Sequence, residues 1–183
     1  MDHQLGRHTK VKDRGQHPMG SQITTIFSTT YLYCMSDDLL INKFVGKYSF
    51  LNNFYASSIW IDGKRYPTCE HAYQAYKTLN ESSRETIRAS KDPMTAKKLG
   101  RGVELRPDWE DVRINLMRDF VRKKFESPFL SDMLLKTGKA RLVHENSWND
   151  KFWGVCRGVG LNWLGIILME IREEIFDSVA SSV

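Results

Sequence analysis

The most regular hydrophobic pattern in the chain lies between residues 107 and 125, where apolar side chains recur at intervals of three and four positions. This spacing predicts an amphipathic helix with one buried stripe. A second helix is expected at 162–176, and because it is apolar on most of its circumference, we expect it to lie centrally in the fold. The residues on or beside the first stripe are Trp109, Val112, Leu116, Met117, Phe120, Val121, Lys124 and Phe125.

Shorter elements are predicted from turn and cap signals. Asp62-Gly63 is a strong hairpin signal, and Thr68 is a plausible N-cap for a helix that continues to about Leu79. A few short strands among several helices predict a compact, mostly helical single domain of the α+β class. The other expected elements are strands at 44–51, 58–61, 64–66 and 140–144, and helices at 82–90, 93–99 and 129–135.

The chain divides into a polar leader and a folded part. Residues 1–22 show neither a helical nor a strand period, so we expect residues 1–34 to be a flexible or non-native N-terminal extension. Within it, 23–33 could form a strand. The domain is expected at 35–183, with Met35 as an alternative start. No apolar run approaches the roughly 18 residues that span a bilayer, and no secretory leader is recognisable, so no membrane partner is expected.

Composition places few limits on the partner. The net charge of +5 permits an anionic ligand such as a phosphate, but it does not demand nucleic acid. The densest basic run, Arg122-Lys123-Lys124, is expected to be the solvated face of a helix. The three cysteines are widely spaced and odd in number, which indicates free thiols in a reducing cytoplasm.

The first candidate site is the segment 67–77. On a helix, four of its side chains share one side at positions i, i+3, i+4 and i+7, namely Glu70, Tyr73, Gln74 and Lys77. A carboxylate in the first turn meets the positive end of the helix dipole, which favours the ionised form. Such a carboxylate could orient water or stabilise positive charge. The alternative is that these are ordinary polar residues on the surface of a helix.

The second candidate site is the segment 146–165, which combines tryptophans, glycines, an aspartate and an asparagine before a helix. Glycines let the backbone come close to a ligand, and N–H groups at a helix start suit anions. The Gly158-x-Gly160 pair is too short for a dinucleotide fingerprint. The alternative is a tight loop whose Trp153 and Trp163 belong to the core.

Other catalytic signatures are absent from the sequence. It has no Gly-x-Ser-x-Gly elbow, no HExxH or cysteine–histidine cluster, and no GxxxxGK[ST] loop. Cys69 and His71 are neighbours in sequence, but we expect a buried thiol there rather than a nucleophile. The sequence therefore predicts neither a metal nor a cofactor.

The two candidate segments together resemble the NADAR family, over about residues 42–176. A single matching block would be weak evidence for the family, whereas the presence of all the blocks in this order is specific evidence for it. The blocks are FLNNFY (50–55), IDGKRYPTCEH (61–71), QAYK (74–77), DPM (92–94) with LGR (99–101), Trp109, ND (149–150) with WG (153–154), and GLNWLG (160–165) running into LMEIR (168–172).

The resemblance implies a compact, mostly helical YbiA-like α+β fold and cleavage of an N-glycosidic bond to ribose. It maps Glu70 to the family's presumed catalytic glutamate. Asp150, Trp153 and Asn162 map to the aspartate, tryptophan and asparagine of its later blocks. Two departures concern the pocket: Asn52 stands where the family often has Ser, and Val155-Cys156 stands where it often has Asp-Gly. The second departure bears on substrate identity more than on activity.

Cleavage of a ribose–nitrogen bond builds oxocarbenium character on the sugar. The expected catalytic residues are Glu70 and Asp150: Glu70 offsets that charge and activates water, and Asp150, together with Asn162, holds the ribose hydroxyls. Trp109 or Trp153 is expected to stack with the base. For two of the expected contacts, Lys77 and Arg101, the alternative is a structural ion pair. The expected substrate contacts besides the tryptophans are Asn53, Lys77, Arg101, Gly154 and Asn162.

Two substrates and one non-enzymatic role stay open. The first substrate is a phosphoribosylamino-pyrimidine intermediate of riboflavin synthesis. The second is an ADP-ribosylated guanine base, in nucleic acid that is bound transiently and whose base is flipped outward. A non-catalytic binding module for NAD or ADP-ribose would keep the aromatic and glycine residues, but it would have no need for Glu70.

Overall fold

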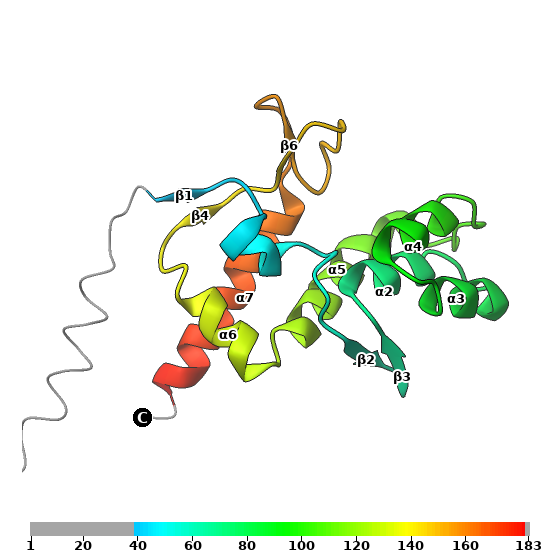
Figure 1. Ribbon diagram of the computed structural model, residues 1–183, viewed down its shortest axis with the longest axis horizontal. Helices are drawn as coiled ribbons and strands as arrows, with labels where there is room; N and C mark the ends of the chain where they lie inside the picture. Colours follow the sequence, from blue (N-terminus) through cyan, green and yellow to red (C-terminus); the bar gives the residue numbers. More distant parts are fainter. Residues whose placement is uncertain (1–38, 182–183) are drawn as a thin grey trace, which may run out of the picture. The chain divides into compact units, whose positions relative to one another are not determined.

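The computed structural model describes residues 39–181 (Figure 1). The expected extension at 1–34, the possible strand at 23–33 and Cys34 lie outside the described residues. The described helices are the 3-10 helix η1 (Gly46–Leu51) and α2 (Cys69–Ala75), α3 (Glu81–Arg88), α4 (Pro93–Gly100), α5 (Trp109–Lys124), α6 (Pro128–Leu135) and α7 (Trp163–Ala180). The described strands are β1 (Leu40–Ile41), β2 (Ile59–Ile61), β3 (Lys64–Tyr66), β4 (Arg141–Leu142), β5 (Glu145–Asn146) and β6 (Val155–Cys156).

The strands of the described part form three separate pairs. β2 and β3 form an antiparallel hairpin in which Ile59 faces Tyr66. Asp62 and Gly63 turn the hairpin with φ angles of 50° and 74°, and positive φ at both central residues suits a type I′ turn. The other pairs, β1 with β4 and β5 with β6, are parallel. The predicted hairpin and the mostly helical α+β class are both confirmed.

The predicted strand at 44–51 is wrong, because this segment forms η1. Gly46 has a φ of 57°, which turns the chain out of the extended conformation. Phe50 and Leu51 are both buried, although adjacent residues of a strand point to opposite faces. The burial of two consecutive side chains in the core therefore overrides the composition of the segment.

Helix α2 is buried along its whole length, although it carries Glu70, His71 and Gln74. Thr68 caps it as predicted, because its hydroxyl accepts a hydrogen bond from the His71 N–H at 3.3 Å. The helix packs against α3, α4 and α5. A polar helix in this position brings titratable side chains into the interior of the domain.

The predicted continuation of this helix to Leu79 is wrong, because α2 ends at Ala75. Beyond this point the backbone forms long-range bonds. The carbonyl of Lys77 accepts from the Arg106 N–H at 2.7 Å. This bond replaces the i to i+4 bond that would have continued the helix.

Helix α7 lies against α5, α6 and β4. Its first half supplies Leu164, Ile167, Leu168 and Ile171 to the core, whereas most side chains after Arg172 are exposed. The expected central position is therefore confirmed only for the first half. None of the described helices combines the length and the apolar character needed to cross a membrane.

Helix α5 carries the predicted stripe, with Trp109, Met117 and Phe120 buried. The expectation of a solvated basic run at 122–124 is wrong, because Lys124 is buried as well. Lys124 falls on the same helical face as Phe120, one turn earlier, so the period of the stripe rather than its charge decides its position.

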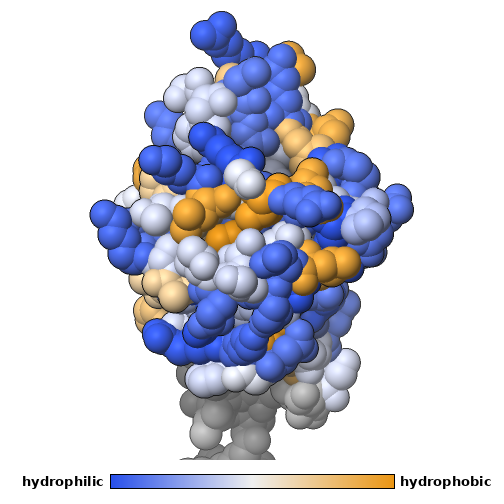
Figure 2. Space-filling model, turned by 90° about the vertical axis from the view of Figure 1, so that its right-hand side faces the viewer, coloured by the Kyte–Doolittle hydropathy of each residue, from blue (hydrophilic) through white to orange (hydrophobic). Residues whose placement is uncertain are grey.

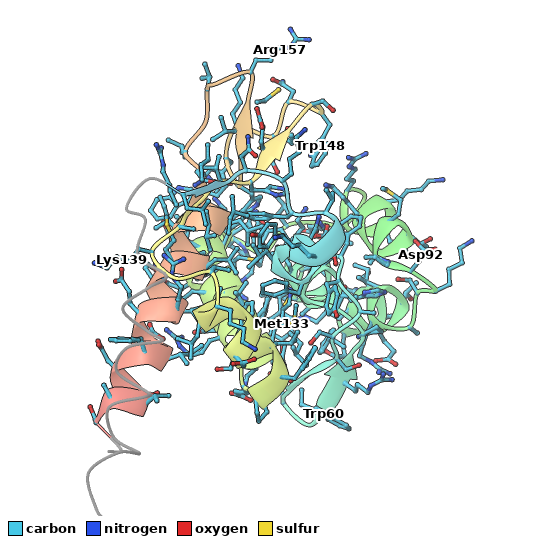
Figure 3. All side chains as sticks on the ribbon, turned by 60° about the vertical axis from the view of Figure 1, so that its left-hand side comes forward. Trp60, Asp92, Met133, Lys139, Trp148 and Arg157 are labelled. Atoms are coloured by element: carbon cyan, nitrogen blue, oxygen red, sulfur yellow. The ribbon has the colours of Figure 1, made fainter. Side chains whose placement is uncertain are left out.

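Two exposed tryptophans lie at separate places in the described structure. In Figure 3, Trp60 projects from the β2–β3 hairpin and Trp148 from the loop that follows β5. Figure 2 shows the face that carries α3 and α4, which is hydrophilic over most of its area with an apolar band through the middle. Cys69 and Cys156 are buried free thiols.

Asn162 joins β4 to the start of α7. It has a φ of 57°, its Oδ1 accepts from the His144 N–H, and its Nδ2 donates to the Leu142 carbonyl, both at 2.9 Å. We expect Asn162→Ala to lower the free energy of unfolding by about 2 kcal/mol, because two buried backbone groups lose their partners. Urea denaturation followed by tryptophan fluorescence measures this change. The control is Asn42→Ala, which removes one exposed hydrogen bond; equal midpoints for the two variants would contradict the role of Asn162.

Candidate active site

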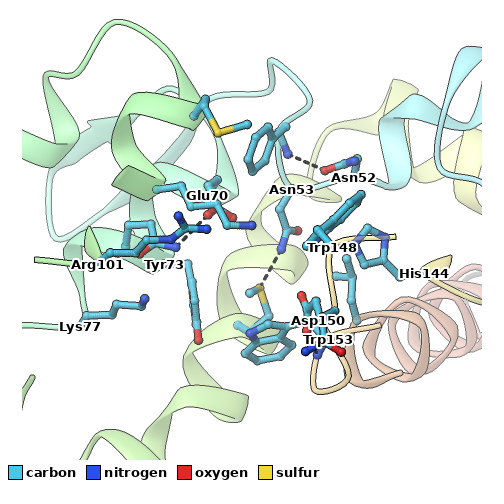
Figure 4. Close-up of a pocket in the computed structure, with 17 residues that line it drawn as sticks. Asn52, Asn53, Glu70, Tyr73, Lys77, Arg101, His144, Trp148, Asp150 and Trp153 are labelled. Atoms are coloured by element: carbon cyan, nitrogen blue, oxygen red, sulfur yellow. Dashed lines mark hydrogen bonds between the residues drawn. The ribbon is translucent and has the colours of Figure 1, made fainter. Parts of the chain in front are cut away.

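A cleft of about 720 Å³ opens where six parts of the chain meet (Figure 4). Side chains from α2 and α4 line one side, and residues of the 144–153 segment line the other. The 52–54 segment also contributes, together with Met117 of α5 and Leu164 of α7. The cleft therefore draws on elements that are far apart in sequence.

Glu70 faces this cleft from the first turn of α2, with only 6% of its surface exposed. Its N–H donates to the Asn53 carbonyl at 3.1 Å. One turn later, Gln74 Nε2 donates to Glu70 Oε1 at 2.8 Å (Figure 4). The backbone and the side chain of Glu70 are thus each held by a residue that also lines the cleft.

Burial raises the pKa of Glu70 above its ordinary value, and the neighbouring Asp150 acts in the same direction. The hydrogen bond from Gln74 and the positive charges of Lys97 and Lys77 oppose this shift. The helix dipole alone would lower the pKa, so desolvation outweighs it. A raised pKa brings the proton equilibrium of this carboxyl closer to neutral pH, where proton transfer is most effective.

A cationic wall, formed by Lys77, Lys97 and Arg101, borders the cleft beside Glu70. Burial lowers the pKa of Lys77 against the attraction of Glu70, and the like charges of Lys97 and Arg101 lower it further. None of the ion pairs formed among residues 39–181 includes these three side chains. The structural ion pair considered for Lys77 and Arg101 is therefore not formed, and the positive charge remains available to a ligand.

An aromatic wall, formed by Tyr73, His144, Trp148 and Trp153, also borders the cleft (Figure 4). The rings of Tyr73 and Trp153 meet edge to face with centroids 5.3 Å apart, and those of His144 and Trp148 are 5.9 Å apart. Trp148 is 57% exposed, and Lys97 Nζ lies 5.9 Å from its ring centroid. A planar ligand would find rings on this wall and positive charge next to it.

Three polar atoms of the cleft residues are buried without a hydrogen-bond partner in the described structure: Asn53 Oδ1, Gln74 Oε1 and His144 Nδ1. The amide of Asn53 donates only to Met117 Sδ, at 3.2 Å, which is a weak acceptor. Burial lowers the pKa of His144, against the charge of Asp150, so its ring is neutral at pH 7. Since an unpaired buried polar atom is costly, Asn53 Oδ1 and His144 Nδ1 indicate a ligand that supplies the missing bonds.

Asp150 stabilises its own loop. Its Oδ1 accepts from the backbone N–H groups of Phe152 and Trp153, at 3.1 and 2.9 Å, and its N–H donates to Asn146 Oδ1 at 3.0 Å. Its second oxygen accepts no hydrogen bond from residues 39–181, so it is open to a ligand. Across that same part of the chain, no group of three or more His, Cys, Asp or Glu side chains is placed to hold a metal ion.

Most of the residues proposed from the sequence meet in this cleft, and three do not line it. Trp109 lies behind the cleft, with its ring centroid 5.2 Å from that of Tyr73. Gly154 packs so closely on the segment at 144–146 that an added Cβ would lie 2.8 Å from Asn146 Nδ2. Asn162 uses its side chain on backbone groups. The proposed residues that line the cleft are Asn53, Glu70, Lys77, Arg101, Asp150 and Trp153.

Sequence reasoning missed Lys97 and His144, and it included Trp148 in the second candidate segment without giving it a role. Lys97 lies in a predicted helix and Arg101 lies four positions later, just past its end. Residues at this spacing share one helix face, so the sequence could have indicated that Lys97 lies beside Arg101. His144, at the end of a predicted strand, and Trp148 both stand outside the blocks that match the family. Only the folding of the 144–153 segment against α2 and α4 brings them to the cleft.

Comparison with known proteins identifies the relatives of this chain. The family model described as the NADAR domain matches residues 41–176. N-glycosidase YbiA of Escherichia coli is 42% identical over 166 residues, which cover 88% of this chain and 94% of that protein. The riboflavin biosynthesis protein VVA0006 of Vibrio vulnificus is 41% identical over 132 residues, covering 70% of this chain and 36% of that protein. The solution structure of E. coli YbiA superposes with a TM-score of 0.72 at 40% identity, covering 80% of this chain and 89% of that one.

Gly100 at the end of α4 packs directly on Gln74. An added Cβ would lie 2.7 Å from Gln74 Cβ and 2.9 Å from its Cδ. Because Gln74 holds the Glu70 carboxylate, we expect Gly100→Ala to cost about 1–3 kcal/mol of stability and to lower kcat/KM roughly tenfold or more. Thermal denaturation and an assay of base release measure the two effects.

The matched control is Gly102→Ala, whose added Cβ would come no closer than 3.6 Å to another residue's atoms. If Gly100→Ala were as stable and active as this control, Gln74 would not be the contact that fixes Glu70.

Proposed function

This chain belongs to the NADAR family and is a hydrolase of N-glycosyl compounds, and we propose that its substrate is a phosphoribosylamino-pyrimidine intermediate of riboflavin synthesis. The observation that carries the proposal is one cleft in which a buried carboxylate, Glu70, lies beside a cationic wall and an aromatic wall. The volume of about 720 Å³ is in the usual range for small-molecule sites.

The cationic wall suits the 5′-phosphate of such a substrate. Lys77, Lys97 and Arg101 are three cations without a carboxylate partner in the described structure, and phosphate oxygens form strong charge-assisted hydrogen bonds with such groups. With the phosphate placed there, the ribose lies next to Glu70. The base then reaches the aromatic wall.

The aromatic wall suits a planar aminopyrimidine. Tyr73, Trp148 and Trp153 offer ring surfaces and edges. Asn53 Oδ1 accepts hydrogen bonds, and the neutral His144 ring either donates or accepts at Nδ1 according to its tautomer. Amino and carbonyl groups on the base supply the partners that both atoms lack in the described structure.

The hydrolysis follows from this placement. The bond between ribose C1′ and the amine nitrogen breaks, and positive charge develops on the sugar. The ionised Glu70 stabilises that charge and takes a proton from a water molecule, whose oxygen bonds to C1′. The leaving amine gains the proton that Glu70 took, so one water is consumed and Glu70 is ionised again. Asp150, fixed by two backbone N–H groups, presents its second oxygen to the ribose hydroxyls.

A second candidate substrate, an ADP-ribosyl group on guanine, draws on a second cavity. It has a volume of about 290 Å³, shares Asn149 with the first, and carries Lys151 and Arg157. A second phosphate would find positive charge there. A nucleic-acid partner and a cytoplasmic location remain predictions. The non-catalytic binding module is the weaker alternative, because a binder gains nothing from a buried carboxylate such as Glu70.

We expect Glu70→Gln to lose about 10²–10⁴-fold in turnover while the fold is retained. The pKa of Glu70 is raised in the folded state, so ionised Glu70 costs stability as the pH rises through this pKa. The variant should therefore be at least as resistant to heat at pH 7. Liquid chromatography of base release measures activity on the phosphoribosylamino-pyrimidine and on an ADP-ribosylated guanine oligonucleotide.

The control variant is Glu81→Gln, at an exposed position in α3. For the wild type we also expect kcat/KM to fall as the pH is lowered through the raised pKa of Glu70, with a midpoint above the usual range for glutamate. An active Glu70→Gln variant would remove the catalytic assignment. Base release from the oligonucleotide alone would favour the second substrate.

Arg101→Gln tests the phosphate subsite. We expect KM for the 5′-phosphorylated substrate to rise roughly tenfold or more, because a charge-assisted hydrogen bond is lost, while the dephosphorylated nucleoside is hydrolysed as by the wild type. Lys98→Gln, on an exposed position of the same helix, serves as the control. An equal effect of Arg101→Gln on both substrates would place the phosphate elsewhere.

A further inference from the structure

Lys124 is a cation in the interior of the domain. It is the last residue of α5 and only 2% exposed. Its Nζ donates to the Asn52 carbonyl at 2.9 Å, and it lies 5.5 Å from the ring centroid of Tyr55 and 5.4 Å from that of Phe125. One carbonyl and two ring faces are thus the groups that hold its ammonium.

No carboxylate in the described structure pairs with this ammonium. The titratable groups that face it are the Cys69 thiol from α2 and the Tyr55 ring. Burial raises the pKa of Cys69 to about 11, so the thiol is neutral at pH 7. Burial lowers the pKa of Lys124 to about 8, so most of the lysine is still charged at that pH. An uncompensated buried charge costs stability, and its retention calls for another benefit.

The hydrogen bonds of Lys124 lead to the cleft. The Asn52 carbonyl that it holds immediately precedes Asn53, whose own carbonyl accepts from the Glu70 N–H at 3.1 Å. Asn52 Oδ1 accepts from the Phe54 N–H at 3.0 Å, which tightens the same turn. Residues 52–54 all line the cleft. The ammonium therefore holds the segment that both lines the cleft and accepts a hydrogen bond from the first turn of α2.

We propose that Lys124 is a positioning residue, which fixes the turn at Asn52–Asn53 and through it holds Glu70 in its catalytic position. Lys124 does not reach the cleft itself. Its role rests on the geometry above, and the catalytic part of the proposal rests on the proposed function of Glu70.

The lowered pKa gives this role a distinctive signature. A lysine whose pKa is lower in the folded state than in the unfolded state binds its proton less tightly when the protein is folded. Its charged form therefore costs stability at pH values below the folded-state pKa. Lys124→Met fills the same space without the charge. The Asn52 carbonyl also keeps a second donor, the Tyr55 N–H at 3.1 Å. We therefore expect the thermal midpoint of Lys124→Met to equal or exceed that of the wild type, although the site is impaired.

Amide hydrogen exchange tests the positioning without any substrate. In Lys124→Met, the Glu70 amide should exchange at least tenfold faster than in the wild type, because its acceptor on Asn53 is no longer held. The exchange rates of the Ile167 and Leu168 amides in α7 should be unchanged.

With the phosphoribosylamino-pyrimidine as substrate, kcat of Lys124→Met should fall roughly ten- to a hundredfold, and Lys124→Arg should recover part of the loss. Lys123→Met, at the neighbouring position, is the matched control.

The outcomes are separable. Faster exchange at Glu70 with a lower kcat and an undiminished thermal midpoint supports the proposal. Unchanged exchange at Glu70, or a fall in kcat that only follows a lower thermal midpoint, overturns it. Faster exchange in a protein whose wild type releases no base leaves the positioning intact and overturns the proposed substrate instead.

Discussion

A carboxylate that is 6% exposed needs hydrogen bonds and nearby positive charge if it is to remain in a folded protein. Glu70 has both, from Gln74 and from the lysines of the cationic wall. This requirement explains why α2 is polar and yet buried throughout. It also explains the close packing of α4 on α2, since Gly100 leaves room for the side chain that binds the carboxylate.

The position of Glu70 between two unlike walls relates the fold to the chemistry. The cationic wall concentrates three positive charges that form no ion pair with any residue of the described structure, and the aromatic wall offers flat apolar surface. A phosphoribosyl group attached to a base has the same division, with an anion at one end and a planar ring at the other. The bond between sugar and base then falls beside the carboxylate, which is the arrangement expected for N-glycoside hydrolysis.

The cleft also depends on groups that do not touch it. Asn162 ties β4 to α7, and Trp109 supports the ring of Tyr73. Lys124 belongs with them, because it holds the turn at Asn52. The three residues differ in their contribution to the stability of the fold. The hydrogen-bonded amide of Asn162 and the packed ring of Trp109 stabilise it, whereas the buried ammonium of Lys124, which has no counterion, does not. In Lys124, positioning of the site and stability of the fold are therefore in opposition.

Local sequence determined the elements whose signals are local. The Asp62-Gly63 turn, the Thr68 cap and the stripe of α5 depend on neighbours within a few residues, and all three are confirmed. The order of the blocks that match the family pattern likewise indicated the family, and it indicated Glu70 as the expected catalytic residue. These features need no knowledge of which distant segments meet.

Tertiary structure decided the rest. The turn to a 3-10 helix at 46–51, the buried position of Lys124 and the arrival of His144 and Trp148 at the cleft all depend on contacts between segments far apart in the chain. Burial changes the energy of a charge by far more than any local propensity. Sequence alone could therefore name the carboxylate, but only the packed fold set its pKa and brought its neighbours to it.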